Sequence, residues 1–242
     1  PIPRIEGGII CVSQLTGNTE KTYLLETNLN NSSFNFKWYF EGIKIESAAL
    51  NNYEASEVGQ YSVVVTNKAT GCVSKSYFAD VIANFPATSF TATVSDAFTQ
   101  DATITTNVQG GTGPFLYQLD NDLFQDYGIF TNLSSGVHKV VVIDLQGCTN
   151  LSAEVLVIDY PKFFTPNGDG YNDTWNINAL NDSRIFIYDR YGKLLKQINS
   201  SGAGWDGTLN SQNLPATDYW FTVDYLESNI NKIFKSHFSL KR

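Results

Sequence analysis

Several residue types are scarce or missing from this sequence of 242 residues, and each absence narrows the class of protein. There is no Met, which predicts that the chain is an excised or mature part of a longer protein. No apolar run reaches the length of about 18 residues that a transmembrane helix needs, and the first residues lack the charged and apolar regions of a signal peptide. We therefore expect no direct membrane insertion, and an export signal removed upstream if the parent is exported.

Histidine and basic residues are also few, and this argues against two functional classes. The only histidines, His138 and His237, are far apart in the sequence, and the motifs of serine hydrolases, zinc proteases and P-loop enzymes are missing. The formal charge of −8 divides into nets of −2, −7 and +1 over residues 1–84, 85–159 and 160–242. Because no segment offers a basic footprint, we expect no nucleic-acid partner. The distant histidines and the missing motifs predict no catalysis, and we expect no cofactor.

The residues that are abundant favour strands and turns. Aromatic residues make up 14% of the chain, charged residues only 17%, and Gly, Asn, Ser and Thr are frequent. Short runs with a period of two, bounded by Gly, Asn or Asp, lie at residues 37–40, 61–66, 139–144, 184–189 and 219–225. These patterns predict an all-β protein of tandem immunoglobulin-like β-sandwich modules with almost no helix. We place the modules at residues 1–84, 85–159 and 160–242.

The first segment resembles an immunoglobulin-like domain. Trp38 follows Cys11 in the order typical of that fold, and the run from Glu57 to Tyr61 resembles a tyrosine corner. A Gly-Cys step at Cys72, near the end of the segment, is similar to those of bacterial surface immunoglobulin-like modules. The resemblance implies a disulfide between Cys11 and Cys72, with Cys148 left buried and reduced.

The second segment carries motifs in a recognisable order. They are Gly-Gly-Thr-Gly-Pro at 110–114, an aromatic-to-Gly run at 130–136, and a Val-rich run that ends in Gly-Cys at 140–149. This order resembles the SprB-type repeat of large gliding-motility adhesins. The Gly-rich run predicts a turn and not a phosphate site, because no Lys and no helix follow it.

The third segment contains five ordered motifs. They read FFTPNGDGYNDTW at 163–175, IYDRYGK at 187–193, GWDGT at 204–208, LPATDYWF at 214–221 and HFSLKR at 237–242. Together they resemble the gliding-motility-associated C-terminal domain, the type B sorting domain of the type IX secretion system of Bacteroidota. The resemblance marks these residues for translocon recognition: Thr165, Pro166, Asn167, Gly168, Asp169, Gly170, Asn172, Asp173, Asp189, Arg190, Gly192, Trp205, Asp206, Gly207, Asp218, Tyr219, Trp220, His237, Phe238, Lys241 and Arg242.

This resemblance implies a function in export without catalysis. The segment would be bound by the outer-membrane translocon and by a PorP/SprF-like membrane protein, and would deliver a larger cargo to the cell surface or medium. We expect a monomer. In the last strand Phe234, Ser236, Phe238 and Leu240 alternate with a polar, mostly basic ridge that ends at Arg242. If this strand lies at a sheet edge, its free backbone groups could extend a partner's sheet.

Two further site hypotheses concern the third segment. Asn167, Asp169 and Asp173 resemble part of a calcium loop, although the first and last ligand positions do not suit the EF-hand pattern and a metal-free Asx-turn is favoured. Trp205 and Asp206 could form a carbohydrate platform, against a turn whose Trp covers the core.

Two rival functions stay open beside sorting. The acidic middle segment could be an adhesive module that binds calcium, glycans or a host surface. Alternatively, the modules could form a structural stalk that only spaces an upstream effector from the cell surface.

Overall fold

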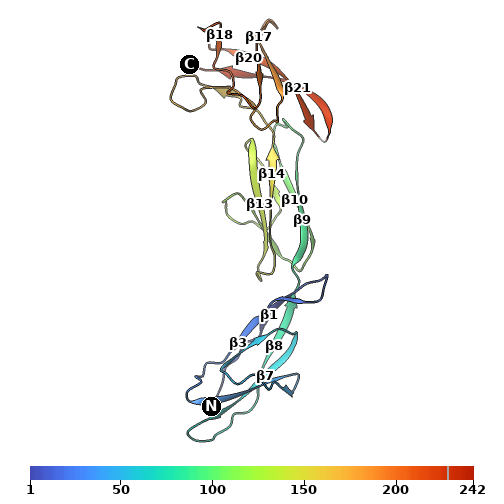
Figure 1. Ribbon diagram of the computed structural model, residues 1–242, viewed down its shortest axis with the longest axis vertical. Coiled ribbons are helices and arrows are strands. Elements are labelled where there is room, and N and C mark those ends of the chain that lie inside the picture. The colour runs from blue at the N-terminus through green and yellow to red at the C-terminus, as the bar shows by residue number, and fades with distance from the viewer. Residues whose placement is uncertain (228) are drawn as a thin grey trace.

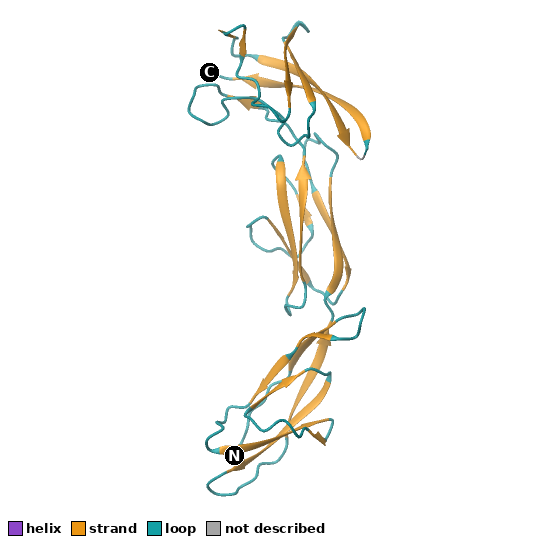
Figure 2. Ribbon diagram, viewed as in Figure 1, coloured by secondary structure: helices purple, strands orange, loops and turns teal. Residues whose placement is uncertain are grey.

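The computed structural model describes residues 1–227 and 229–242 and contains strands, turns and loops but no helix in these ranges. Three β modules follow one another along an elongated molecule, with the amino terminus in the lowest module and the carboxy terminus in the highest (Figure 1). Figure 2 draws the described residues as strands and loops. The described residues include no helix long and apolar enough to span a membrane. The all-β prediction is confirmed.

The N-terminal module packs a six-stranded sheet, in the order β2-β1-β8-β7-β4-β5, on the pair β3-β6. Its strands are β1 (Gly8–Val12), β2 (Thr19–Lys21), β3 (Tyr23–Glu26), β4 (Phe34–Phe40), β5 (Ile43–Lys44), β6 (Asn52–Ala55), β7 (Gly59–Asn67) and β8 (Tyr77–Asn84). Trp38 is fully buried between the layers, and its indole N–H donates to the Leu50 carbonyl at 2.9 Å. The Tyr61 hydroxyl donates to the Glu57 carbonyl at 3.1 Å, which confirms the predicted tyrosine corner.

The middle module has two three-stranded sheets, β12-β10-β9 and β11-β13-β14. Its strands are β9 (Ala87–Val94), β10 (Ile104–Gly110), β11 (Phe115–Leu119), β12 (Ile129–Phe130), β13 (Gly136–Asp144) and β14 (Asn150–Val157). Ile104, Val140 and Val142 are fully buried between the sheets. Val140 and Val142 alternate with more exposed neighbours along β13, as the period of two predicts.

The terminal module is built on one five-stranded sheet, in the order β15-β21-β20-β16-β17. The strands of the module are β15 (Phe163–Phe164), β16 (Arg184–Tyr188), β17 (Leu194–Asn199), β18 (Thr208–Leu209), β19 (Gln212–Asn213), β20 (Asp218–Glu227) and β21 (Ile230–Leu240). Of these, β18 and β19 form a separate pair. One face of the sheet is covered by loops that contribute Trp175 and Trp205, both buried. The Phe238 ring stacks on Trp175 with centroids 3.8 Å apart. The core therefore lies on one side of the sheet.

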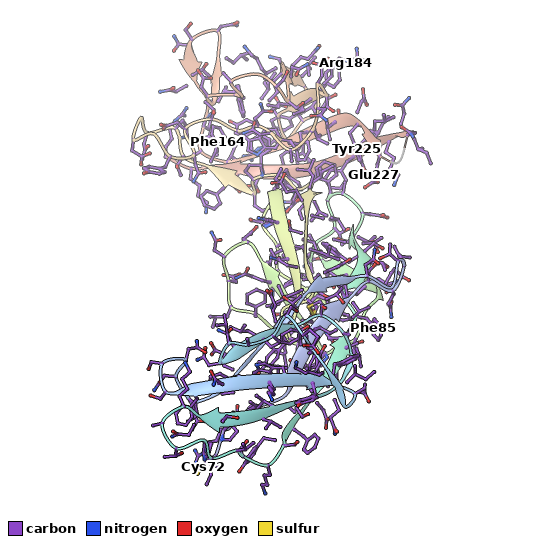
Figure 3. The ribbon with its side chains drawn as sticks, turned by 60° about the horizontal axis from the view of Figure 1, so that its bottom comes forward. Cys72, Phe85, Phe164, Arg184, Tyr225 and Glu227 are labelled. Carbon is purple, nitrogen blue, oxygen red and sulfur yellow. A yellow bond between two sulfur atoms is a disulfide. The ribbon has the colours of Figure 1, made fainter. Side chains whose placement is uncertain are left out.

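The disulfide joins different cysteines from those expected. Cys11 is bonded to Cys148, across the junction between the N-terminal and middle modules, and Cys72 is free and exposed. The prediction of a Cys11–Cys72 bridge is wrong, and so is that of a reduced Cys148. Figure 3 shows Cys72 at the end of the N-terminal module that lies away from Phe85, the residue that follows β8.

Strand length explains why Cys11 cannot reach Cys72. Cys11 pairs with Asn84 at the end of β8, whereas Cys72 precedes the start of the same strand. Eight extended residues separate the two ends by roughly 25 Å. A disulfide requires Cα atoms about 4.4–6.8 Å apart, and the Cα atoms of Cys11 and Cys148 are 5.4 Å apart.

Polar contacts reinforce this junction. The buried carboxylate of Asp144 accepts hydrogen bonds from the backbone N–H groups of Gln146, Cys148 and Thr149, and from the side-chain amide of Asn84 at 3.4 Å. Burial raises the pKa of Asp144, but the hydrogen bonds from Thr149, Cys148 and Gln146 outweigh it and hold the pKa below its ordinary value. The turn that carries Cys148 is thereby fixed against the preceding module.

The cysteine arrangement predicts a distinct thiol pattern. In the unfolded, unreduced protein one thiol should react, and Cys72→Ser should abolish the reaction without changing the melting temperature, because this side chain is exposed. Cys148→Ser should lower the stability by about 2–4 kcal/mol, since a native cross-link is lost. Thiol titration and calorimetry measure both effects. Three reactive thiols in the wild-type chain would contradict the observed bridge.

Candidate recognition surface of the terminal module

The last strand alternates as its sequence predicts. Phe238 and Leu240 are buried and Phe234 and Ser236 are half-buried, whereas the residues between them point to the opposite face of the sheet. Lys235 and His237 are exposed on that face. The basic ridge therefore exists along the middle of β21.

The same strand has a largely open edge. On one side β21 pairs with β20 along its whole length, from Ile230 opposite Glu227 to Ser239 opposite Asp218. On the other side β15 pairs with only Ser239 and Leu240. Within the part of the chain that the structure describes, no strand pairs with this side of β21 between residues 230 and 238.

Backbone direction identifies the groups that this edge presents. The N–H of Ser239 donates to the Lys162 carbonyl at 2.9 Å and that of Lys241 to the Phe164 carbonyl at 3.0 Å, both toward β15. Every second residue of an antiparallel strand points its N–H and C=O to the same side. Lys235 and His237 therefore direct their backbone groups toward the open edge.

A cleft of about 510 Å³ lies on the outer face of the sheet, beside this edge. The indole of Trp220 is 41% exposed and lies 6.1 Å from the His237 ring. The lining combines aromatic, basic and polar side chains: Tyr188, Asp189, Arg190, Gly192, Trp220, Phe221, Thr222, Lys235, Ser236 and His237. An aromatic platform with a cationic rim suits a polar, acidic partner.

The turn between β16 and β17 supplies one wall of the cleft. The Asp189 carboxylate accepts hydrogen bonds from the N–H groups of Tyr191 and Lys193 at 2.8 and 2.9 Å, so it shapes the turn. Gly192 has a φ of +79°, a conformation that a side chain would strain. The Arg190 guanidinium donates to the Thr217 hydroxyl at 2.6 Å and is positioned at the rim.

The loop at residues 165–173 bonds to itself. The Asp173 carboxylate accepts hydrogen bonds from the N–H groups of Gly168 and Gly170 at 2.6 and 2.8 Å. The Asp169 carboxylate accepts hydrogen bonds from the Tyr171 N–H and from the Asn167 side-chain amide. Both bonds lower the pKa of Asp169, and the bond from Tyr171 has the larger effect. This is the geometry of the expected Asx-turn. The carboxylates considered as calcium ligands already accept hydrogen bonds from N–H groups of the same loop. Their oxygen atoms therefore do not fit a preformed cation site.

The remaining residues of this loop set its shape. Asn172 has a φ of +52° and its carbonyl accepts the Thr165 N–H at 2.7 Å, which closes the loop beside Pro166.

The Trp205 motif belongs to the core. Trp205 is 1% exposed and donates from its indole to the Thr208 carbonyl, while the Asp206 carboxylate accepts from the Thr208 N–H and hydroxyl. A Cβ on Gly207 would lie 2.5 Å from the Leu240 side chain. The carbohydrate platform is therefore wrong here, because the indole face is buried.

Other motif residues hold the end of the sheet. Tyr219 is buried and its hydroxyl donates to the Pro215 carbonyl at 2.8 Å, and Asp218 accepts from the Ser239 hydroxyl at 2.6 Å. Arg242 turns back and donates to the carbonyls of Leu214 and Gly207.

The basic ridge consequently does not extend to Arg242, in contrast to the sequence prediction, because these backbone acceptors hold its guanidinium. The ammonium of Lys241 lies 4.2 Å from the centroid of the Phe163 ring, at the end of the ridge.

The buried His138 of the middle module has two acceptors. Its Nδ1 lies 2.8 Å from the Asp120 carboxylate and its Nε2 2.9 Å from the Ser134 carbonyl, so both nitrogens act as donors only in the protonated ring. Burial lowers the pKa of His138, but the bonds to Ser134 and Asp120 raise it above its ordinary value of 6.5. Ser134 contributes a carbonyl and not a hydroxyl, so the three residues do not form a catalytic triad.

One residue of the terminal core has no signal in the sequence that assigns it there. Phe98, from the middle module, is 8% exposed and packs with the core of the terminal module. No periodic signal identifies it, since it lies in a loop between strands.

His138 makes stability depend on pH with a defined sign. The folded pKa is raised, so the stabilisation is complete below pH 6.5 and is lost as the pH rises through the folded pKa. The melting temperature of the middle module should therefore fall as the pH rises from 6.5 into the alkaline range, and His138→Asn should flatten that dependence. Calorimetry over this range measures it. His237→Gln, at an exposed site, serves as control, and a wild-type profile without a fall would refute the assignment.

Comparisons with known proteins place this geometry in context. No curated protein matches the sequence. The chain is similar to the fibronectin(III)-like modules of Clostridium thermocellum CbhA, with 13% identity, a TM-score of 0.38, and coverage of 64% of this chain and 94% of that chain. It is also similar to chicken CNTN1 FN1-FN3 domains, with 10% identity, a TM-score of 0.23, and coverage of 99% and 100%.

A third similar structure is that described as the structural basis for Dscam isoform specificity. Its identity is 12% and its TM-score 0.27, with coverage of 100% of this chain and 72% of that chain. In contrast to these distant likenesses, residues 158–240 match the family model of the CHU_C type IX secretion signal domain. This match supports a C-terminal sorting signal in the terminal module and implies export across the outer membrane to the cell surface or medium.

Proposed function

We propose that the outer-membrane translocon of the type IX system binds the terminal module by adding a strand to the open edge of β21. The observation that supports this is the coincidence of three features on one strand. β21 has free backbone groups between residues 230 and 238, exposed basic side chains, and a cleft beside them. Strand addition supplies affinity through backbone hydrogen bonds and specificity through alternate side chains.

The side chains define the chemistry of the partner strand. Lys235 and His237 line both the edge and the cleft, and Trp220 offers an exposed aromatic surface between them and β16. A partner segment with acidic side chains is complementary to this rim. A PorP/SprF-like membrane protein, working with the general pore, is the partner that we propose for this contact. The chain acts as a monomer and performs no catalysis.

The other modules act as cargo in this proposal. We divide the chain at residues 84 and 159, with the N-terminal module immunoglobulin-like and the middle module a SprB-type repeat of Bacteroidota surface proteins. Their elongated arrangement separates the sorting signal from any upstream effector (Figure 1).

A proline on the open edge tests strand addition directly. Lys235 points its N–H away from β20, so Lys235→Pro removes a donor from the edge and leaves the β20 ladder intact. A reporter with a signal peptide, fused ahead of the full chain, should lose export about tenfold or more with this variant. The measurement is the reporter activity on the surface and in the medium relative to the periplasm.

One matched variant and one measurement separate the edge from the charge and from the fold. Lys235→Thr keeps the N–H and a good strand former, so it should export far better than the proline variant. Unchanged melting temperatures of both variants exclude unfolding as the cause. Normal export of a folded Lys235→Pro variant would count against the edge as the recognition element.

A second candidate function, glycan binding, is favoured by one loop of the middle module. Between β11 and β12, Leu123 is 92% exposed and Tyr127 60% exposed. Tyr127 lines a cleft of about 470 Å³ together with Asp122 and Gln125. An aromatic face beside a carboxylate is typical of sugar sites.

A glycan array probed with the full chain tests this second function. Binding should be lost with Tyr127→Ala and retained with Tyr191→Ala, which removes a still more exposed ring from the terminal module. An array without any bound glycan would remove this candidate.

A further inference from the structure

The core of the terminal module contains a side chain from the preceding module. Its fully packed members lie within residues 158–240, with one exception among the residues that the structure describes. That exception is Phe98, which belongs to the loop of residues 95–103 between β9 and β10. We call this segment the bracing loop.

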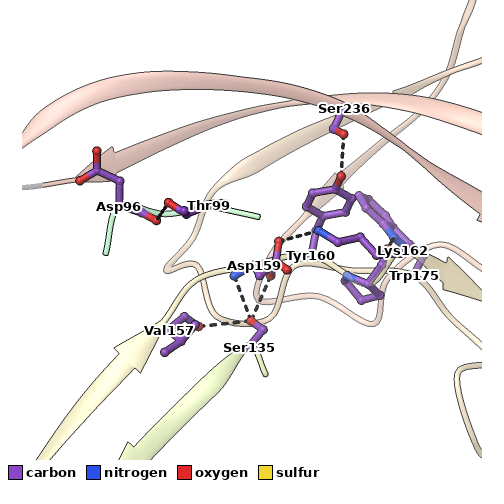
Figure 4. Close-up of polar contacts among 10 residues, drawn as sticks. Asp96, Thr99, Ser135, Val157, Asp159, Tyr160, Lys162, Trp175 and Ser236 are labelled. Carbon is purple, nitrogen blue, oxygen red and sulfur yellow. Dashed lines mark hydrogen bonds and ion pairs between the residues drawn. The ribbon is translucent and has the colours of Figure 1, made fainter. Parts of the chain in front are cut away.

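Phe98 sits among aromatic rings of the last two strands. Its ring stacks on Phe234 with centroids 4.2 Å apart and an interplanar angle of 11°, and meets Tyr225 edge-on at 5.1 Å. The Tyr160 ring completes the cluster, with its centroid 6.2 Å from that of Phe98. Its hydroxyl is hydrogen-bonded to the Ser236 hydroxyl at 2.6 Å (Figure 4). The ring thus covers the core side of the β20–β21 hairpin, whose outer edge is the proposed recognition element.

Polar contacts fix the loop in this position. The Ala97 N–H donates to the Glu227 carboxylate at 2.7 Å, and the Phe98 N–H to the Ile158 carbonyl at 2.8 Å. Glu227 also pairs with Lys232 across the hairpin, at 2.5 Å, and these two partners lower the pKa of Glu227, Lys232 more than Ala97. Figure 3 shows Tyr225 and Glu227 near one end of the terminal module. The loop therefore contacts both strands of the hairpin.

The backbone of Phe98 is strained to make these contacts. Its φ is +64°, a left-handed conformation that a bulky side chain rarely adopts. Such a conformation persists only where surrounding contacts over-determine it, and it clusters at functional contacts. The hydroxyl of Thr99 donates to the Asp96 carbonyl at 2.6 Å and closes the turn around Phe98 (Figure 4).

The two module junctions differ in kind. The N-terminal and middle modules are joined by the Cys11–Cys148 bridge and by polar groups around Asp144. The middle and terminal modules share apolar surface through Phe98, beside the hydrogen bond from Ala97 to Glu227. Only the second junction reaches the strand that carries the open edge.

We propose that the bracing loop is part of the sorting signal: the middle module holds the β20–β21 hairpin through Phe98, and the translocon recognises the hairpin in this braced form. This inference rests on the proposed function of β21. The recognition unit then extends beyond residues 158–240 to the loop at 95–103, and Phe98 is a positioning residue that acts through Phe234 and Tyr225.

Backbone and ring contributions are separated by Phe98→Asn in the full chain. Asn accepts a left-handed conformation more readily than Phe, so the variant relieves the backbone and removes only the ring. Hydrogen exchange of the amides of Tyr225, Lys232 and Phe234 should accelerate by about tenfold or more, since the hairpin loses its packing on one face. The amides of Ile185 and Ile187, in β16, should keep their wild-type rates.

A matched control removes an aromatic ring from the middle module alone. Phe90, on β9, is half-buried against the core of that module. Phe90→Ala should accelerate exchange in the middle module and leave the hairpin amides unchanged. Unchanged hairpin exchange in Phe98→Asn, or an equal acceleration throughout the terminal module, would overturn the bracing role.

Export provides the functional readout. A reporter fused ahead of the full chain should be exported at least about fivefold less with Phe98→Asn, and Phe98→Leu should restore most of the loss because it refills the aromatic cradle with an apolar side chain. Wild-type export with Phe98→Asn would overturn the inference and leave the proposed function intact. Failure of the wild-type reporter would instead contradict the proposed function, while the exchange result would stand by itself.

Discussion

The stacking of Phe238 on Trp175 fixes the last strand, and the rest of the proposed recognition surface depends on it. The two rings lie 3.8 Å apart with an angle of 11° between their planes, and Trp205 meets Phe238 edge-on. A shift of one residue would expose Phe238 and bury Lys235, because strand side chains alternate between faces. The aromatic core therefore determines which side chains of β21 face outward and which backbone groups reach the edge.

The motif residues of the terminal module serve two physical purposes. Most of them build turns and core: Asp189 and Asp173 bind backbone N–H groups, and Trp205 and Tyr219 are buried. A smaller group, with Trp220 as its most exposed aromatic member, lines the outer cleft. A sequence motif is thus no direct guide to surface position, since most of these motif residues form turns or core and only some line the cleft.

The two junctions between modules are held by different interactions. A covalent bridge and the buried Asp144 join the first two modules, where reduction of the bridge removes one restraint and leaves the hydrogen bonds. Apolar packing around Phe98 joins the last two. The Phe98 ring packs on Phe234 and Tyr225, so the middle module contacts the hairpin that carries the open edge.

The sequence by itself determined the features that depend on local periodicity. The period of two gave the strands, the alternation of Phe238 with Lys235 gave the two faces of β21, and the Glu57–Tyr61 run gave the tyrosine corner. Only the tertiary structure decided which cysteines meet, whether Arg242 extends the ridge, and that Phe98 enters another module's core. These are contacts between segments distant in the chain, and their distances follow from strand lengths and module packing, which no local pattern encodes.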